Sequence, residues 1–335
     1  MKNWQETTIL FKEIVRLLSE GRNGALAMIV GLEGSAYRSP GAKLLVRDDG
    51  SMIGNVSGGC LESDVMENGL AAIKSGKPRY LHYDTGGGED KIWGLGVGCG
   101  GKVDVLVIPF CAPGFAEAVE SARTCLRGDK VFSISTVVSG APDVGRMTVV
   151  NAETNKGSTQ EGVRVFTEVL QPPPRLIVCG AGDNARPVIR LSAEAGFRVT
   201  VVDHRSAYLT ESRFPDAVSL VAGRAEDAVF DFEVGRETLA VVMFHILVHD
   251  KAWVSRFAEK GVKYIGLLGS RSRRGDIMAG LSEEQKARVY GPVGLDIGAV
   301  GPEQVAISIV SEVLAVFSGR KPQHLRDRNR GIHEN

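Results

Sequence analysis

The spacing of apolar and polar residues predicts a succession of helices and strands in the first half of the chain. Apolar residues recur every three or four positions over 5–20, which is the period of an amphipathic helix. Helical spacing also predicts helices at 60–74, with acidic residues early, and at 113–126. Short apolar runs bounded by turn residues predict strands at 25–30, 42–47, 79–84, 102–110, 130–139, 146–150 and 162–170. The first half is therefore expected to be a mixed α/β domain.

The second half alternates between strand and helix patterns. Strands are predicted at 175–179, 199–202, 219–222, 238–244 and 263–268, with helices at about 224–231, 250–260 and 302–317. Two glycine-rich turns, at 180–185 and 269–274, each follow a strand and open a helix. Alternating strands and helices pack as a parallel sheet with helices on both faces. The predicted fold class is α/β, with a Rossmann-like, doubly wound parallel sheet in this half.

A run of three prolines, Pro172 to Pro174, separates the two halves. Proline lacks a backbone N–H and restricts φ, so the run continues neither a strand nor a core helix. We therefore expect an N-terminal domain at 1–170, a linker at 171–174 and a C-terminal domain at 175–319. The remaining residues, 320–335, form a charged tail.

The composition narrows the class of protein. Lys plus Arg and Asp plus Glu number 40 each among 335 residues, so no net basic charge favours nucleic acid as a partner. No apolar run reaches the roughly 18 residues of a membrane span, and the first residues lack the features of a secretory signal. We expect a cytoplasmic protein with no membrane partner. Five scattered cysteines without a C-x-x-C pair predict neither a disulfide framework nor a structural zinc site.

The stretch 31–62 concentrates glycines, one thiol and one arginine. Cys60 follows Gly58 and Gly59 at the start of a predicted helix, where free N–H groups favour a thiolate. The two glycines would let the backbone approach a ligand closely, and Ser57 would add a donor. The alternative is a small buried cysteine in a tight turn, because free cysteines are usually buried.

Two further features extend this candidate site. Arg38 lies in a loop of small residues that includes Ser35, and its guanidinium would suit an oxygen of a phosphate or a pterin. A solvated loop arginine is the alternative. Cys99, next to Gly98 in a second glycine-rich segment, is the second candidate thiol. The spacing does not show whether Cys60 and Cys99 meet in space.

The second half carries a mononucleotide-binding pattern. Gly180-x-Gly182 follows a strand and opens a helix, and Asp203 ends the next strand, 23 positions after Gly180. Asp203 would accept a hydrogen bond from a ribose hydroxyl, whereas Arg205 would favour a 2′-phosphate, so NAD(P) is a candidate cofactor. Domains of this kind also bind other ligands or none, and Asp203 capping a loop is the alternative.

Histidines follow a later strand, at the edge where such sheets bind ligands. His245 is expected to face a ligand, and together with His249 and Asp250 it would suit a metal if the segment were helical. The basic helix start at 271–274 would suit an anion, or it is a solvated turn. No G-x-S-x-G, H-E-x-x-H or P-loop motif is present, so no self-contained hydrolytic or phosphoryl-transfer chemistry is assigned.

Taken together, these residues resemble the XdhC/CoxI family, the xanthine dehydrogenase accessory factors, over nearly the whole chain. The N-terminal half carries the blocks GSAYRSPGA at 34–42, GNVSGGCLE at 54–62 and GVGCGG at 96–101. The C-terminal half resembles the family's Rossmann-like domain at the 180–182 turn, at Asp203, at YIGLLGSR (264–271, with Ser270 and Arg271) and at PVGLDIG (292–298). Phe244 precedes His245 where the family often has a threonine.

The resemblance implies a chaperone for the molybdenum cofactor, molybdopterin, rather than a turnover enzyme. Such proteins bind the cofactor, protect it while its terminal sulfur is installed and help to insert it into a molybdenum hydroxylase apoenzyme. A sulfur donor of the cysteine desulfurase type is then a second partner. Cys60 or Cys99 would contact the molybdenum or relay sulfur, because thiolate is a soft ligand suited to such a centre.

Two other functions remain open. An NAD(P)-dependent oxidoreductase would use Gly180, Gly182 and Asp203 to bind its nucleotide. A scaffold would use the Rossmann-like domain only to dock partner proteins. We expect the Cys60 loop, the Cys99 loop and the carboxyl edge of the sheet to form the walls of one composite site, and a homodimer would help to bring such loops together.

Overall fold

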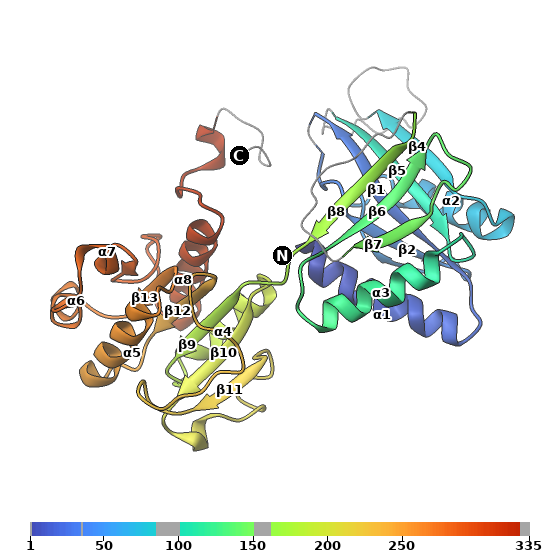
Figure 1. The fold of residues 1–335 in the computed structure, drawn as a ribbon. Coiled ribbons are helices and arrows are strands. Elements are labelled where there is room, and N and C mark those ends of the chain that lie inside the picture. Colours follow the sequence, from blue (N-terminus) through green and yellow to red (C-terminus); the bar gives the residue numbers. More distant parts are fainter. Residues whose placement is uncertain (1, 35, 85–100, 151–161, 329–335) are drawn as a thin grey trace. The chain divides into compact units, whose positions relative to one another are not determined.

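The computed structural model describes residues 2–34, 36–84, 101–150 and 162–328. The chain forms two compact units, Met1–Pro172 and Pro173–Asn335, so the division falls inside the proline run (Figure 1). Within the described ranges, no helix is both long enough and apolar enough to cross a membrane.

In the described residues, the N-terminal unit contains two antiparallel sheets and three helices. The larger sheet has the order β3-β2-β1-β5-β4, built from β1 (Gly24–Glu33), β2 (Lys43–Arg47), β3 (Met52–Gly54), β4 (Arg79–Asp84) and β5 (Lys102–Pro109). The smaller sheet has the order β7-β6-β8, built from β6 (Phe132–Ser139), β7 (Met147–Val150) and β8 (Arg164–Leu170). The helices are α1 (Lys2–Ser19), α2 (Glu62–Ser75) and α3 (Phe115–Arg127).

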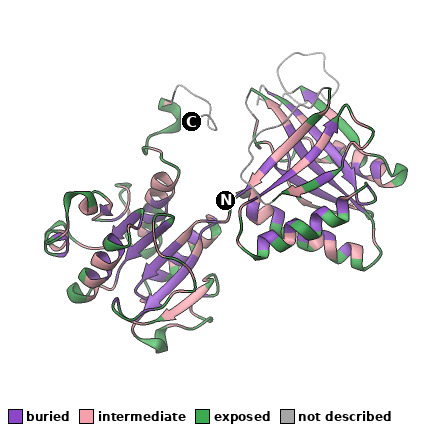
Figure 2. Ribbon diagram, in the orientation of Figure 1, coloured by how far each residue is buried: buried purple, intermediate pink, exposed green. Residues whose placement is uncertain are grey.

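Strand β1 is the central strand of the larger sheet, and most of its residues are buried (Figure 2). Leu26 and Met28 pack in a core shared with α1 and α3. Ala27 and Ile29 point to the opposite face and pack in a second core with α2. Successive side chains of a strand alternate between faces, so a strand buried on both faces reads as an uninterrupted apolar run.

A buried ion pair connects α1, β2 and β8. The Lys43 side chain is fully buried, and its Nζ donates to Glu168 Oε2 at 2.6 Å and to the Gly41 carbonyl at 2.9 Å. Asn3 Nδ2 donates to the other carboxylate oxygen of Glu168 at 2.9 Å. A Cβ at Gly41, where φ is +90°, would lie 2.6 Å from that oxygen, so the site requires glycine. Each charge therefore depends on its partner, because an unpaired buried ion is strongly disfavoured.

We predict that Lys43→Met destabilises the protein by about 3–5 kcal/mol, because it leaves the Glu168 carboxylate buried without a counter-ion. The double variant Lys43→Met/Glu168→Leu should recover most of that loss, because it removes both charges. Chemical unfolding followed by circular dichroism measures the difference. Equal stability of the single and double variants would contradict the assignment.

The C-terminal unit contains a six-stranded sheet of order β11-β10-β9-β12-β13-β14. All of its neighbouring strands are parallel. The strands are β9 (Arg175–Cys179), β10 (Arg198–Asp203), β11 (Ser219–Ala222), β12 (Thr238–Val242), β13 (Tyr264–Leu267) and β14 (Val289–Tyr290). The predicted Rossmann-like sheet is confirmed.

Helices cover both faces of this sheet (Figure 1). Helices α5 (Leu247–Glu259) and α6 (Arg271–Met278) pack together and share a core with the inner strands, which includes Trp253 and Phe257 of α5 and Ile177 and Ala240 of the strands. Helices α4 (Ala185–Glu194) and α8 (Pro302–Phe317) pack against each other, and their residues do not belong to that core. Because the inner strands β9 and β12 are buried on both sides, every residue after the first one in each strand is apolar.

Some predicted elements differ from the structure. Residues 224–231 contain a turn at 225–227 and no helix, in contrast to the prediction, because Asp227 Oδ1 accepts a hydrogen bond from the Arg224 amide at 2.6 Å and closes the backbone locally. Helix α2 begins at Glu62 rather than at residue 60. The short elements β3, β14, α7 (Glu283–Lys286) and the 3₁₀ turns η1 (Ser206–Tyr208) and η2 (Leu325–Asp327) were not predicted.

Candidate functional site

The first candidate site lies at the carboxyl edge of the parallel sheet, where β9 turns into α4. Gly180 has a φ of +112°, and a Cβ there would lie 2.9 Å from the carbonyl oxygen of Met243, just after β12. Only glycine lets this turn pass so close to the backbone that follows β12. Gly182 differs, because a Cβ there would meet no described atom within 4 Å. The space beside Gly182 is open to a ligand.

The Asp203 carboxylate, at the end of β10, holds this turn in place. The Asp203 side chain is fully buried and accepts four hydrogen bonds, from the Ala181 amide at 2.8 Å, the Arg205 amide at 2.9 Å, Arg205 Nε at 3.0 Å and Arg205 Nη2 at 2.8 Å. Burial raises the pKa of Asp203, but these hydrogen bonds outweigh it, and the net pKa is lowered. A carboxylate offers about four acceptor positions, so none is left for the predicted ribose hydroxyl.

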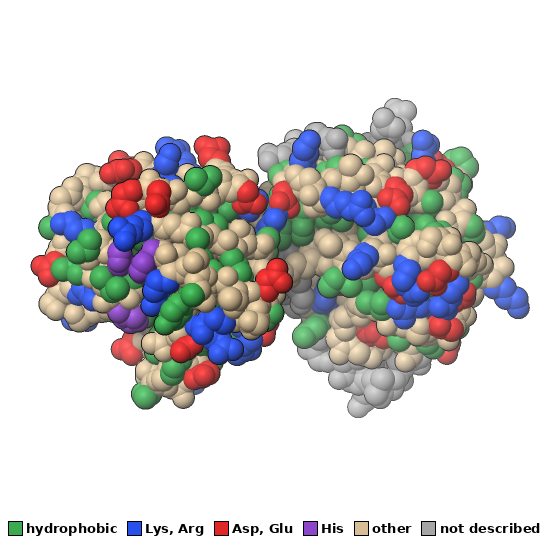
Figure 3. Space-filling model, turned by 90° about the horizontal axis from the view of Figure 1, so that it is seen from below, with side chains coloured by type: hydrophobic (Ala, Val, Ile, Leu, Met, Phe, Trp, Pro, Cys, Tyr) green, Lys and Arg blue, Asp and Glu red, His purple; other side chains and the backbone are tan. Residues whose placement is uncertain are grey.

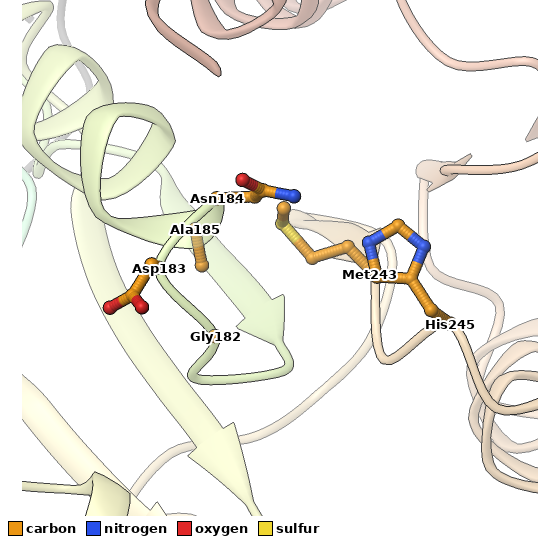
Figure 4. A pocket seen from close by; sticks show the side chains of 6 residues that line it. All are labelled: Gly182, Asp183, Asn184, Ala185, Met243 and His245. Carbon is orange, nitrogen blue, oxygen red and sulfur yellow. The ribbon is translucent and has the colours of Figure 1, made fainter. Parts of the chain in front are cut away.

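Six residues line a hollow of about 290 Å³ beside the glycine turn (Figure 4): Gly182, Asp183, Asn184, Ala185, Met243 and His245. In Figure 4 the side chains of Asn184, Met243 and His245 border the same space, whereas Asp183 points away from it. The hollow lies between the ends of β9 and β12, where the strand order reverses. Open α/β sheets bind ligands at that position.

Backbone donors are available at this end of α4. Asn184 is the N-cap residue, and its side chain makes no capping hydrogen bond. Within the described part of the chain, the amides of Gly182, Asp183 and Asn184 donate to no backbone carbonyl. Arg213 Nη2 pairs with the Asp183 carboxylate at 2.9 Å, which reduces the negative charge nearby. Free amides at a helix N-terminus favour an anionic group.

His245 has a strained backbone at the mouth of the hollow. Its φ of +63° is uncommon for a residue with a side chain. The fully buried Asp250 accepts from the Phe244 amide at 3.1 Å and from Arg273 Nη2 at 2.5 Å, and Arg273 Nη1 donates to the His245 carbonyl at 3.0 Å. Burial is the largest cause of the raised pKa of Asp250, and Arg273 opposes it. These contacts hold His245 in its strained backbone conformation. Strained residues of this type are found most often at functional sites.

Of the residues proposed for a metal site after β12, His249 and Asp250 have partners within the chain. His249 stacks on His204 with ring centroids 4.6 Å apart, and histidine side chains gather on one face of this unit (Figure 3). Asp250 is engaged by Arg273. Among the residues that the structure describes, no group of three or more His, Cys, Asp or Glu side chains is placed to hold a metal ion.

The start of α6, which follows β13, also lies at the carboxyl edge of the sheet, beside the ends of β10, β9 and β12. Ser270 is the N-cap residue, and its hydroxyl accepts from the Arg273 amide at 3.4 Å. Arg271, the first helical residue, is exposed. Because β10, β9, β12 and β13 are neighbours in the sheet, the topology brings Asp203, Gly182, His245 and Ser270 to the ends of four adjacent strands.

In the N-terminal unit, the loop before α2 is organised around Glu62. The Glu62 carboxylate accepts from the amides of Val56 at 3.1 Å, Ser57 at 2.9 Å and Gly59 at 2.8 Å, and also from the Ser57 hydroxyl. Burial raises the pKa of Glu62, and these hydrogen bonds more than offset it, so the pKa is lowered. Ser57, which the sequence suggested as a donor to a ligand, and the Gly59 amide are therefore used by the chain itself.

The neighbouring residues of this loop have structural partners as well. Gly58 donates its amide to Asn55 Oδ1 at 3.0 Å, and a Cβ at Gly58 would lie 2.8 Å from the Tyr37 ring. Cys60 lies two residues before α2, not at its first residue, and its thiol is exposed and free. The exposed thiol excludes the alternative of a buried core cysteine.

Arg38 does not extend into solvent. Its side chain is buried and pairs with Glu6 of α1, with Arg38 Nη2 2.7 Å from Glu6 Oε2. Burial is the main cause of the raised pKa of Glu6, against the opposing effect of Arg38. Ser35, Gly98 and Cys99 lie outside the described residues. The roles of Glu62, Asn184 and Met243 were missed from the sequence, where only the acidic first turn of α2 gave a signal.

A parallel sheet with a glycine turn and a hollow at the point where its strand order reverses defines a Rossmann-like α/β protein. Residues 176–313 match the XdhC Rossmann domain, and residues 17–84 match the XdhC and CoxI family. A protein of Bacillus subtilis (strain 168), described as a probable subunit of xanthine dehydrogenase, is 33% identical over 322 residues, which cover 89% of this chain and 94% of that protein. The chain belongs to the XdhC and CoxI family.

Two further relatives extend the comparison. The molybdenum cofactor insertion chaperone PaoD of Escherichia coli (strain K12) is 24% identical over 90% of this chain and 86% of that protein. A crystal structure described as a xanthine dehydrogenase from Bacillus halodurans superposes with a TM-score of 0.80 at 27% identity, covering 94% of this chain and 96% of that one. The similarity thus includes both units.

We predict that Asp203→Asn lowers stability at pH 7 by ~1–3 kcal/mol, because the amide loses the charge and one acceptor oxygen. The folded pKa of Asp203 is lowered, so its carboxylate stabilises the fold above the unfolded pKa of roughly 3.9, and this contribution is lost as pH falls through the folded pKa. Thermal unfolding of both proteins at pH 7 and pH 3 should show the difference shrinking at acid pH. A difference that does not change with pH would contradict the charged role of Asp203.

Proposed function

We propose that this protein is an accessory factor that binds the molybdenum cofactor as cargo, protects it while its terminal sulfur is installed and helps to insert it into a molybdenum hydroxylase of the xanthine dehydrogenase type. The observation that carries the proposal is the similarity to a molybdenum cofactor insertion chaperone over 90% of this chain. The B. subtilis relative, whose description refers to xanthine dehydrogenase, supports the class of client enzyme.

The carboxyl-edge hollow has the chemistry to hold such a cargo. The amides of Gly182, Asp183 and Asn184 suit the phosphate of a pterin cofactor, and Gly182 leaves room for close approach. The Asn184 amide and the His245 ring can hydrogen-bond to a polar heterocycle, and the Met243 thioether adds a polarisable surface. These residues would bind and orient the cargo.

The exposed Cys60 thiol is the candidate for the sulfur step. Its loop is held rigid by Glu62, so the thiol projects from a pre-organised turn. A sulfur donor of the cysteine desulfurase type would reach an exposed thiol, and Cys60 would pass the sulfur on or contact the molybdenum. We also propose that the protein acts as a homodimer.

We predict that Gly182→Leu weakens cargo binding without unfolding the protein, because the new side chain enters the open space beside the hollow. The protein is purified from a host that makes the cofactor, and the bound pterin is oxidised and measured by fluorescence. The loss should be at least about tenfold, or ~1.4 kcal/mol. Gly275→Leu, in α6 and also without described atoms within 4 Å of a Cβ, is the matched control. A wild-type protein that carries no pterin would refute the proposed function.

We predict that Cys60→Ser retains the pterin but lowers sulfuration of the client. Serine keeps the size of the side chain and removes the soft thiolate. Cys111→Ser is the matched control, because Cys111 is also exposed and, among the described residues, its thiol hydrogen-bonds only to the Gly76 carbonyl, at 3.8 Å. The specific activity of the client hydroxylase, before and after chemical sulfuration, gives the readout. Equal activation by both variants would remove the thiol role of Cys60.

A further inference from the structure

The place where a Rossmann-like domain recognises a ribose is filled by the chain's own side chains. In nicotinamide-binding domains, an acidic residue at the end of the second strand accepts from the ribose hydroxyls. Asp203 holds that position at the end of β10, but its side chain is fully buried and its acceptor positions are taken. Half of the four hydrogen bonds to it come from the Arg205 guanidinium.

The Arg205 guanidinium is held by two partners, the Asp203 carboxylate and the Tyr208 ring. Its Nε and Nη2 contact the two different carboxylate oxygens of Asp203, which is a bidentate arrangement. Its guanidinium carbon also lies 4.0 Å from the centroid of the Tyr208 ring, within the range of a cation–π contact. These contacts use Nε, Nη2 and one face of the guanidinium, so a 2′-phosphate of NADP would have to compete with Asp203 and Tyr208 for Arg205.

Arg213 closes the same region from the other side. It donates from Nη2 to the Ala181 carbonyl at 3.1 Å and to Asp183 Oδ1 at 2.9 Å, so it bridges the glycine turn. Its guanidinium carbon lies 5.2 Å from the Tyr208 ring centroid. Tyr208 therefore contacts both arginines, and the segment after β10 is tied to the turn after β9.

We infer that Arg205 is a specificity-determining residue that closes the ribose position of this domain against NAD and NADP. The glycine turn and the hollow beside Gly182 remain open, so the domain keeps an anion-binding end while its nucleoside end is occupied by Arg205 and Tyr208. The inference concerns the same domain as the proposed function but rests on the contacts among Asp203, Arg205 and Tyr208, not on the cargo.

The test is a calorimetric titration of the full-length chain with NADH and with NADPH. The wild-type protein should show no binding at nucleotide concentrations up to about 1 mM. Arg205→Met keeps an apolar stem over Tyr208 but releases one acceptor position on each carboxylate oxygen of Asp203. This variant should gain NADH affinity by at least about tenfold.

Three further variants make the result specific. Arg205→Ala repeats the opening with a smaller side chain, and Arg205→Met/Asp203→Asn should lose the gain because the charged acceptor is gone. Arg190→Ala is the control, because Arg190 is an exposed arginine of α4 that pairs only with Glu194, among the described residues. Near-UV circular dichroism of each variant establishes that the C-terminal unit is folded.

Two results would overturn the inference. Wild-type binding of NADH or NADPH well below 1 mM would show that Arg205 does not close the site. Folded Arg205→Met and Arg205→Ala proteins that gain no affinity would show that Arg205 is not what excludes the nucleotide. Neither result bears on the pterin carried by the purified wild-type protein, so failure here is distinguishable from failure of the proposed function.

Discussion

The buried carboxylate of Asp203 is the interaction on which the geometry of the C-terminal site depends. A fully buried charge is tolerated only when it is paired and hydrogen-bonded, and Asp203 meets this condition by drawing in the Ala181 amide and the Arg205 side chain. The turn after β9 and the segment after β10 are thereby fixed to each other. Together with the close approach of Gly180 to Met243, this pairing positions Gly182 and the hollow beside it.

The same principle organises the loop before α2 in the N-terminal unit. There the Glu62 carboxylate collects three backbone amides and one hydroxyl, so the loop is ordered by an anion that the chain supplies. In both units an internal carboxylate occupies donors that a glycine-rich sequence would otherwise offer to a ligand. Among the described residues of these two loops, the exposed Cys60 thiol and the open start of α4 remain available to external molecules. Because these loops are already ordered by their own hydrogen bonds, less entropy is lost when a ligand binds to the groups they present.

Much of the fold could be predicted from the sequence because its strands are buried on one or both faces. The predicted ranges of β4 (Arg79–Asp84), β9 (Arg175–Cys179) and α8 (Pro302–Phe317) agree with the structure. The helix predicted at 224–231 was wrong because an acidic side chain closed the backbone locally, an effect that periodicity does not register. Glycines were harder still: Gly41 and Gly58 serve packing against Glu168 and Tyr37, whereas Gly182 faces open space.

The sequence by itself determined the α/β class, the division at the proline run and the membership of the XdhC and CoxI family, because these depend on local pattern and on motifs. Only the tertiary structure decided what the charged residues do. Arg38 pairs with Glu6, far away in the sequence, and the Asp203 carboxylate accepts hydrogen bonds from Arg205, where a ribose was expected. The reason is physical: a charged side chain takes whichever partner the fold brings within hydrogen-bonding distance when water is excluded, and that partner is not written in its sequence neighbourhood.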